Sequence, residues 1–520
     1  MSAQPALKVT QVDVFAEARD DFASLPQLLC TAEAQRMSHS DMERQLGERG
    51  RELMRKLYQA WLDQQAGAAA DGPVVDTDGQ ERSDERHHER DLETTFGTVR
   101  VGRTGYGTAG QASLHPLDAQ LNLPEEKYSL EVRRRVAEEA TKSAFEEVAE
   151  TLARHTGAHV PKRQVEELVC RAAQDFDDFY QTRRQEAPGS HPAAGALLVV
   201  TCDGKGVVLH REDLREVTRQ AAERQQPKLH TRLTQGEKAH RKRMATVAAV
   251  YTIQPFQRTP EQMLHILARQ PVELALPPRP RPQEKRVWAS LEQEPGQVLE
   301  EAFEDAVDRD PHADKAWVSV VDGNETQLAL LEDLATAHGR QLTVILDIYH
   351  VMEYLWQAGH VFHAKGTPEL EAWVLERLGR LLRGEASQVA AGMRRSATKR
   401  GLAKKKRKAV DVCARYLLKY KPYLRYHEYL AVGMPIGSGV VEGACRHLIN
   451  DRLGKTGARW RLTGAEAVLR LRALRASGDF DEYWHFHEAR EYERTHQARY
   501  AGGHVPSMTT AKSPNLKVVQ

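Results

Sequence analysis

Cysteine is scarce in this chain of 520 residues, which contains only five. No two of them lie within four residues of each other, so C-x-x-C zinc pairs are excluded and a disulfide framework is not expected. Long apolar runs are missing as well, and no stretch approaches the ~18 residues of a membrane span. The N-terminal segment MSAQPALKVTQVDVFAEARDDF lacks the basic-then-apolar pattern of a signal peptide. We therefore expect a cytoplasmic protein without membrane-spanning segments.

A dominant charge of one sign is also lacking, because the net charge is only +1. This balance hides local asymmetry: residues 391–408 carry nine Lys or Arg and no acid, and residues 237–243 are basic too. Local basic patches on a neutral chain are typical of nucleic-acid contact. A solvated loop explains either run equally well. At ~150 residues per domain, the length predicts about three or four units.

The N-terminal region begins with helical spacing and continues with strand signals. Residues 1–70 have apolar side chains near helical period. Residues 68–90 are polar and rich in Gly and Asp, which predicts a linker or loop. Residues 93–106 alternate around two glycines and predict a β-hairpin.

A helix pair is predicted within residues 143–183, where two amphipathic stretches are joined by a short Gly-containing turn. Lys162 and Arg163 lie at the exposed start of the second helix, just after a proline that suits its first turn. A DNA-reading helix-turn-helix has this spacing. So does an ordinary helical hairpin, and both interpretations stay open.

Apolar runs of strand length begin after a predicted linker at residues 186–194. ALLVVTCDGKGVVLH predicts two strands around Asp-Gly-Lys-Gly, MATVAAVYTI predicts a third, and the prolines between 277 and 282 form a stiff connector. Helix and strand patterns then alternate up to residue 350, in the order β-β-β-α-β-α-β. This order is typical of a mixed α/β sheet. Residues 351–434 have helical spacing and are expected to form an all-helical insertion.

Three acids occupy positions suited to metal chemistry. Asp203 and Asp322 each end an apolar run on Asp-Gly, and Glu442 opens a predicted helix after Gly-Ser-Gly. Strand ends hold two carboxylates rigidly side by side, and a helix brings the third across. Their oxygens suit Mg²⁺, and two such ions ~4 Å apart activate a nucleophile and stabilise the leaving oxygen of a phosphodiester. A lone Asp-Gly is commonly just a turn, so the combination carries the interpretation.

Other polar residues are expected around these acids. Asp347 ends the last predicted strand and competes with Asp322 as the second ligand; together with His350 it could instead orient neighbouring groups. Ser438 is a candidate N-cap for the following helix. Arg446, on the same helix face as the third acid, could steady that carboxylate or meet a phosphate.

Candidate DNA contacts are basic residues with aromatic residues between them. In the insertion, tyrosines 416, 420, 423, 426 and 429 alternate with Lys421 and Arg425, which suits phosphate contact and base stacking. Core packing of the tyrosines and ion pairing of the basic residues are the alternatives. The residues expected to contact DNA are Lys162, Arg163, Arg394, Arg395, Lys404, Lys405, Lys406, Arg407, Lys408, Arg452, Lys455, Arg459 and Trp460.

Several segments resemble bacterial insertion-sequence transposases of the Kra type, DDE enzymes distantly similar to Mutator-like transposases: GSGVVEGACRHLINDRLGKTGARWRLTGAEAVLRLRAL, LDIYHVMEYLW, VVDGNE, CDGKG and FDEYWHFH. The resemblance runs from about residue 93 to 487 and is specific at residues 322–356 and 435–487. It implies a ribonuclease-H-like core with acids on the first strand, at the end of the fourth and on a helix after the fifth. The catalytic and metal-binding residues carried over are Asp203, Asp322 and Glu442.

The resemblance also implies an activity and an organisation. The protein would be a DNA transposase that uses two Mg²⁺ ions, or Mn²⁺ in their place, to cleave element ends and join their 3′-hydroxyls to target DNA without a covalent protein intermediate. Its partners would be terminal inverted repeats, target DNA and at least one more copy of itself, near the bacterial nucleoid. The cysteine-rich ribbon that related families often carry near the hairpin is missing here, so DNA recognition is expected elsewhere, with residues 143–183 as the candidate. The rivals are a structure-specific nuclease on the same fold and a non-catalytic, transposase-derived DNA-binding protein.

The chain is expected to divide into segments with separate tasks. A mostly helical N-terminal DNA-binding region precedes the α/β ribonuclease-H-like core and its insertion. The expected segments are 1–90 (helices and linker), 91–186 (hairpin and helical DNA-binding region), 195–350 (first part of the core), 351–434 (helical insertion), 435–487 (final catalytic helices) and 488–520 (tail).

Overall fold

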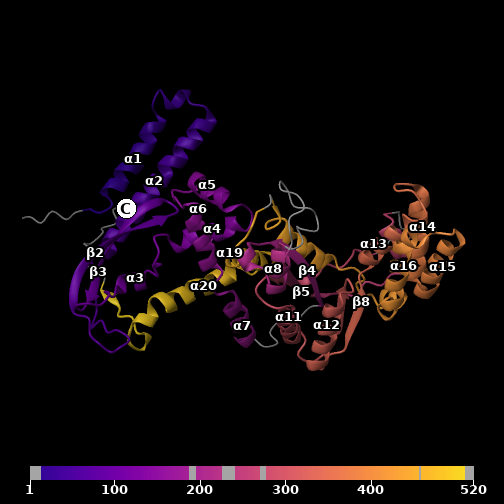
Figure 1. The fold of residues 1–520 in the computed structure, drawn as a ribbon. Coiled ribbons are helices and arrows are strands. Elements are labelled where there is room, and N and C mark those ends of the chain that lie inside the picture. Colours follow the sequence, from indigo (N-terminus) through magenta and orange to yellow (C-terminus); the bar gives the residue numbers. More distant parts are fainter. Residues whose placement is uncertain (1–12, 187–194, 225–240, 270–276, 456–457, 510–520) are drawn as a thin grey trace, which may run out of the picture. The chain divides into compact units, whose positions relative to one another are not determined.

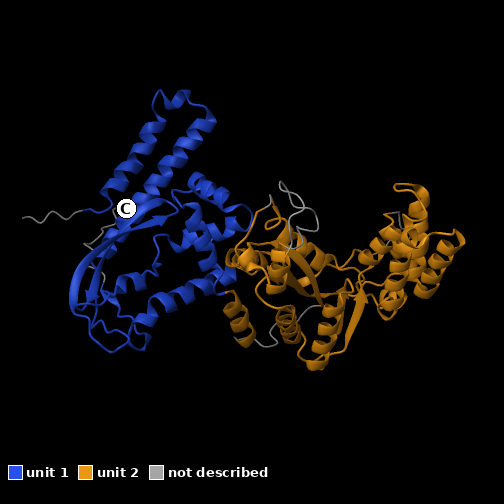
Figure 2. Cartoon of the chain, viewed as in Figure 1, with its two compact units in different colours: residues 1–175, 481–520 blue, residues 176–480 orange. Residues whose placement is uncertain are grey.

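The computed structural model describes residues 13–186, 195–224, 241–269, 277–455 and 458–509 (Figure 1). The chain forms two compact units, one of residues 1–175 with 481–520 and one of residues 176–480 (Figure 2). The predicted linker, apart from its first residue, and residues 237–240 of the second basic run lie outside the described residues.

The first unit begins with two packed helices, α1 (Ala16–Leu29) and α2 (His39–Ala66). The helical prediction for residues 1–70 is confirmed by these helices, but it is wrong at Ala69–Ala70, which form a strand. Helix α2 ends at Gly67, and a two-stranded pair follows in which β1 (Ala69–Ala70) binds β9 (Met508–Thr509) antiparallel. The segment that follows α2 is therefore paired with residues 508–509 within this unit.

A long antiparallel hairpin, β2 (Asp84–Thr94) and β3 (Gly97–Gly107), packs against α2. The hairpin was predicted, but the loop expected over residues 68–90 is wrong from Asp84 onward. The first half of β2 is polar and mostly exposed, so it lacks the apolar alternation of a strand signal and takes its backbone partners from β3. Their buried core is formed by Leu62, Leu92, Val99, Val101 and Leu123.

Helices complete the first unit: α3 (Pro116–Gln120), α4 (Leu130–Ala140), α5 (Phe145–His155), α6 (Lys162–Ala172) and α20 (Phe480–Thr495). Helices α5 and α6 are the pair predicted from spacing. The fully buried guanidinium of Arg133 on α4 forms ion pairs with Glu126 and with Glu491 on α20. Because a buried charge needs such partners, this network fastens α20 to the helices of the first unit. The segment expected as a tail therefore begins in the middle of a packed helix.

The second unit is built on a five-stranded mixed sheet of order β6-β5-β4-β7-β8. Strands β4, β5 and β6 are antiparallel neighbours, whereas β4, β7 and β8 are parallel. The predicted α/β class and mixed sheet are confirmed. The strands are β4 (Leu197–Val208), β5 (Lys242–Ile253), β6 (Gln283–Ser290), β7 (Ala316–Val321) and β8 (Leu342–Leu346).

Strand β4 corrects the sequence-based division of the sheet. Two strands were expected around Asp-Gly-Lys-Gly, but β4 runs unbroken through these residues, with Asp203 opposite Val247 and Gly206 opposite Met244. The long partner strand β5 supplies a backbone ladder on this side, which overrides the local turn signal. The third strand of the predicted order is instead β6, which follows the proline-rich connector.

Helices surround and extend this sheet. The helices other than the insertion are α7 (Phe176–Glu186), α8 (Glu216–Arg224), α10 (Pro260–Leu267), α11 (Pro295–Arg309), α12 (Glu325–Ala337), α18 (Gly439–Ala444) and α19 (Leu462–Ser477), with a π-helix at Cys445–Asn450. The segment predicted as a helical insertion is helical and contains α13 (Ile348–Gly359), α14 (Pro368–Leu382), α15 (Ala386–Lys399), α16 (Lys404–Lys419) and α17 (Tyr426–Ala431). Within the described ranges, every helix is too short or too polar to cross a lipid bilayer.

Candidate active site

A cavity of ≈ 690 Å³ opens where β4, β7 and β8 meet the helices that follow them. Six carboxylates line it: those of Asp203, Asp322, Asp347 and Glu442, which the sequence had singled out, and those of Glu353 and Asp451. We call this cavity the acid pocket. The three acids expected to be catalytic, and the competitor of the second, therefore line one pocket although up to 239 residues separate them in the sequence (442 minus 203).

Strand register explains why three of these carboxylates gather. Val199 of β4 pairs with Val318 of β7, and Asp203 and Asp322 each lie four residues further along. They therefore lie at matching positions beyond the last paired residues of two adjacent parallel strands, with Asp322 directly after the end of β7. The same holds across the next pair of strands, because Val321 pairs with Leu346 and an aspartate follows each, Asp322 and Asp347.

Asp203 and Asp322 are half-buried, and hydrogen bonds engage both carboxylates. Oδ1 of Asp203 accepts from the Gly204 amide at 2.6 Å, and its Oδ2 accepts from the Cys445 thiol at 3.2 Å. Oδ1 of Asp322 accepts from the Asn324 amide at 2.9 Å. Cys445 lies in the π-helix and is buried, and the sequence analysis did not anticipate this contact.

Asp347 has a different environment from the other two aspartates. It is buried, and its carboxylate accepts from the Ser438 hydroxyl at 2.6 Å, the Ser438 amide at 3.3 Å and the Tyr349 amide at 3.1 Å. Burial raises the pKa of Asp347, while the Ser438 hydrogen bonds oppose that shift. Asp347 thus caps α13 and fastens the segment that leads into α18.

Ser438 directly precedes α18. Its side chain was predicted to cap that helix, but it makes no capping hydrogen bond there. The Ser438 hydroxyl instead donates to the Asp347 carboxylate. The two segments are also held together by a backbone hydrogen bond from the Ile348 amide to the Ile436 carbonyl at 3.0 Å. His350 pairs with Glu353 at 3.8 Å and also lines the acid pocket.

Glu442 lies in the first turn of α18 and is exposed. Among the described residues, no side-chain hydrogen bond or ion pair engages its carboxylate. Arg446, expected to steady it, pairs with Asp451 at 3.8 Å. The π-helix that begins at Cys445 adds a residue to the turn, so the face expected from regular helical spacing is shifted.

The donor chemistry of the acid pocket fits Mg²⁺, because carboxylate oxygens are the ligands that this ion prefers. The geometry is not that of an assembled centre: in the part of the chain that the structure describes, no three His, Cys, Asp or Glu side chains converge as metal ligands. One oxygen of Asp203 is engaged by a thiol, and Glu442 is turned to solvent. Ligation by the predicted triad would require these two side chains to rearrange.

Tyrosines 416, 420, 426 and 429 are buried core residues, so the packing alternative is correct for them, whereas Tyr423 is partly exposed. Three of their hydroxyls donate to backbone carbonyls beside the acids: Tyr416 to Asp322 at 2.9 Å, Tyr420 to Gly323 at 2.6 Å and Tyr426 to Leu346 at 2.8 Å. None of these three rings is presented for stacking on a base, because each is buried.

The basic run at residues 391–408 forms the end of a helical hairpin rather than a solvated loop. It covers the last turns of α15, a short connection and the first turns of α16. The side chains of Arg394 and Arg407 reach Asp411, at 3.9 and 3.0 Å. Arg395 and the lysines are exposed, and within the described residues no ion pair engages the side chains of Lys404, Lys405, Lys406 or Lys408.

The other expected DNA contacts fall into two groups. Lys162 and Arg163 lie exposed at the start of α6, where they face Glu146 at 3.9 Å and Glu167 at 3.2 Å, respectively. Lys455 and Arg459 are exposed beside residues 456–457, which lie outside the described ranges. Arg452 and Trp460 are instead buried and stack on each other, with the guanidinium carbon 4.7 Å from the ring centroid. These two side chains stabilise the fold and are not presented to a DNA surface.

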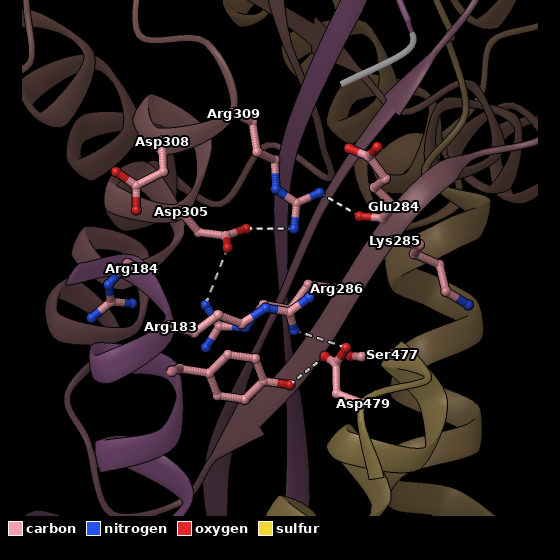
Figure 3. Close-up of a pocket in the computed structure, with 11 residues that line it drawn as sticks. Arg183, Arg184, Glu284, Lys285, Arg286, Asp305, Asp308, Arg309, Ser477 and Asp479 are labelled. Carbon is pink, nitrogen blue, oxygen red and sulfur yellow. Dashed lines mark hydrogen bonds and ion pairs between the residues drawn. The ribbon is translucent and has the colours of Figure 1, made fainter. Parts of the chain in front are cut away.

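A second, smaller cavity of ≈ 140 Å³ lies between α7, β6 and α11 (Figure 3). Its charged side chains mostly neutralise one another: Arg183 pairs with Asp479 at 2.9 Å, and Arg309 pairs with Asp305 at 2.8 Å. Arg286 is buried beneath them, with its guanidinium carbon 3.6 Å from the centre of the Tyr180 ring. This network fastens α7 to the edge of the sheet, and sequence reasoning missed it because its members lie far apart in the chain.

Comparison with known proteins adds no family assignment: neither a protein-family model nor a curated protein matches this sequence. The interpretation of the acid pocket therefore depends on its own residues.

Proposed function

We propose that this chain is a DNA transposase with a ribonuclease-H-like catalytic core, which cleaves the ends of a mobile element and transfers the freed 3′-hydroxyl strands into target DNA. One observation carries the proposal. Asp203 and Asp322 lie at matching positions beyond the paired residues of two adjacent parallel strands, and Glu442 lines the same pocket from a helix after the last strand.

The sheet order supports this proposal. Counted from β4, the strands follow the spatial order 3-2-1-4-5, with the first three antiparallel and the last two parallel to the first. Asp203 then lies on the first strand, Asp322 directly after the fourth and Glu442 beyond the fifth. These are the positions that a ribonuclease-H-like fold gives to its catalytic acids.

In the proposed reaction, Asp203, Asp322 and Glu442 hold the metal, and the chemistry that two Mg²⁺ ions supply is activation of a nucleophile and stabilisation of the leaving oxygen. Asp322 is preferred to Asp347 as the second acid. Its carboxylate is half-buried and bonded only to a backbone amide among the described residues, whereas Asp347 is buried and bonded to Ser438.

The lysines at the start of α16 support the DNA part of the proposal. Cations at a helix N-terminus oppose the helix dipole, and no acid in the first turn of α16 compensates them. Such an exposed and electrostatically unfavourable cluster is suited to phosphate groups, which would neutralise it. Element ends and target DNA are the proposed partners, and the pairing of two ends favours a dimer or a larger assembly.

The test is cleavage and joining in Mg²⁺ of duplexes that carry the DNA flanking this reading frame on each side. Asp203→Asn and Glu442→Gln are expected to lower cleavage by more than about 100-fold, since even residues that only support a metal ligand contribute about 10- to 100-fold. Asp333→Asn, at an exposed position on α12, is the matched control and should cleave like the parent chain.

Each outcome distinguishes the proposal from its rivals. Cuts at the element ends followed by strand joining would support a transposase. Cuts without joining, preferably on branched duplexes, would indicate a nuclease, and tight end binding without metal-dependent cuts would indicate a DNA-binding protein. Full cleavage by Asp203→Asn would refute the assignment of the acids.

A further inference from the structure

Helix α16 reaches the segment that carries Asp322 through two tyrosine hydroxyls. Tyr416 donates to the Asp322 carbonyl at 2.9 Å, and Tyr420, one helical turn later, donates to the Gly323 carbonyl at 2.6 Å. Residues i and i+4 project from the same helix face, so both hydroxyls approach the segment together. Both rings are buried, and burial raises the pKa of Tyr416, so its hydroxyl remains a proton donor.

The segment that receives these bonds determines how the Asp322 carboxylate points. Gly323 has φ +92°, in the left-handed region, and a Cβ there would meet the Tyr420 ring at 3.4 Å. The next amide, that of Asn324, donates to Oδ1 of Asp322, and the Asn324 side chain caps α12. The carboxylate orientation is therefore linked to the backbone of two residues whose carbonyls are held by α16.

Other tyrosines of the insertion make further contacts around these two hydrogen bonds. The Tyr354 ring of α13 stacks on Tyr416 with centroids 4.0 Å apart and planes 15° apart. Tyr426 donates to the Leu346 carbonyl at 2.8 Å, immediately before Asp347. Hydroxyls of the insertion thus hold the ends of both β7 and β8 at the edge where the acids lie.

We propose that Tyr416 and Tyr420 are positioning residues for the Asp322 carboxylate: their hydroxyls fix the carbonyls of Asp322 and Gly323, and this orients the carboxylate toward the acid pocket. The inference rests on the proposed function of that pocket. It assigns the helical insertion a role in the site that involves no contact with the reacting atoms.

Removal of the hydroxyls alone tests this role. The double variant Tyr416→Phe/Tyr420→Phe keeps both rings in the core, and Tyr423→Phe is the control, because Tyr423 donates to Glu332 on α12 and not to the acid-bearing segment. Two properties of the full chain are measured: hydrogen exchange of peptides covering residues 321–326, and Mn²⁺ binding followed by electron paramagnetic resonance. The affinity of each protein for duplexes that carry the DNA flanking this reading frame is measured in parallel.

The double variant should exchange faster over residues 321–326 and bind Mn²⁺ about 10-fold more weakly, the usual size of an effect on residues behind a metal ligand. Its DNA affinity and the behaviour of Tyr423→Phe should match the parent chain. Parent-like Mn²⁺ affinity in a folded double variant would overturn the inference and leave the proposed function standing. If the parent chain bound no Mn²⁺ and cut no DNA, the proposed function would fall and this inference with it.

Discussion

The thiol of Cys445 donates a hydrogen bond to Oδ2 of Asp203 across 3.2 Å. The bond connects the middle of β4 with the π-helix that follows α18. Burial raises the pKa of the Cys445 thiol, and the negative charge of Asp203 adds to this shift, so the thiol stays protonated and donates. One oxygen of a proposed metal ligand is thus engaged by a group that a bound cation would have to displace.

Cys445→Ala should therefore strengthen the binding of divalent cations. Removing a competing hydrogen bond of ~1 kcal/mol corresponds to about three- to tenfold in affinity. Cys445→Ser keeps a donor and should remain close to the parent chain, and Cys413→Ala, at a buried thiol in the insertion, provides the control. Mn²⁺ titration of the four proteins measures the effect. Equal affinities for the alanine and serine variants would show that the thiol does not compete.

Much of the fold of the second unit was predictable because its signals are local. Apolar residues repeat at helical spacing through the insertion, and the short strands β7 and β8 are apolar runs with an aspartate at the end. Strand β4 was misread because its Asp-Gly-Lys-Gly sequence favours a turn, and only the pairing with β5 over 12 residues reveals a continuous strand. β6 was missed because its first half, Gln-Glu-Lys-Arg, is polar and mostly charged.

The acids that line the acid pocket could be predicted from the sequence, but the hydrogen bonds that their carboxylates accept could not. An apolar run followed by Asp-Gly marks Asp203 and Asp322 in the sequence itself, although Asp203 lies within β4 and not at its end. Nothing local predicts that Ser438 would bind Asp347 or that Cys445 would bind Asp203, since these pairs lie 91 and 242 residues apart. The same limit applies to the tyrosines, whose spacing fits a core and a DNA surface equally well until their partners are known.

Ser438→Ala should destabilise the junction between β8 and α18. It removes the hydroxyl donor from the buried carboxylate of Asp347, and a buried acceptor that loses a partner costs about 1–3 kcal/mol. Thr336→Ala, at an exposed hydroxyl on α12, should change stability by less than about 0.5 kcal/mol. Thermal unfolding gives the overall effect, and hydrogen exchange over residues 436–442 locates it. Unchanged exchange there would contradict the proposed fastening of α18.

Lys405→Gln should weaken DNA binding and reduce its salt dependence. If the exposed lysines at the start of α16 neutralise phosphates, loss of one contact lowers the slope of log K against log salt by about 0.9. Lys365→Gln, at an exposed lysine between α13 and α14, should leave the slope unchanged. The DNA affinity of both variants is measured by fluorescence anisotropy at salt concentrations from about 50 to about 300 mM, and the two slopes are compared. Identical slopes for Lys405→Gln and the parent chain would exclude the start of α16 as a phosphate contact.

The first unit should lose stability in mild acid because of His496. Burial lowers the pKa of this imidazole to about 4, and the cationic Arg499 and Arg90 add to the shift. Between an unfolded pKa of ~6.5 and this value, the unfolded chain binds a proton that the folded unit does not, so stability rises with pH and is lost as pH falls. The expected loss from pH 7 to pH 5 is about 2 kcal/mol, and the His115 pKa of about 4 acts in the same direction.

His496→Gln should flatten this pH dependence, because glutamine does not titrate. His39→Gln, at an exposed position at the start of α2, should leave it unchanged. Hydrogen exchange of peptides from α20, measured at pH 7 and pH 5 and corrected for intrinsic rates, reports the opening free energy of this unit separately from the sheet unit. If α20 in His496→Gln lost as much protection from exchange between pH 7 and pH 5 as in the parent chain, groups other than His496 would cause the acid sensitivity. A smaller loss in the variant would identify His496 as one of its causes.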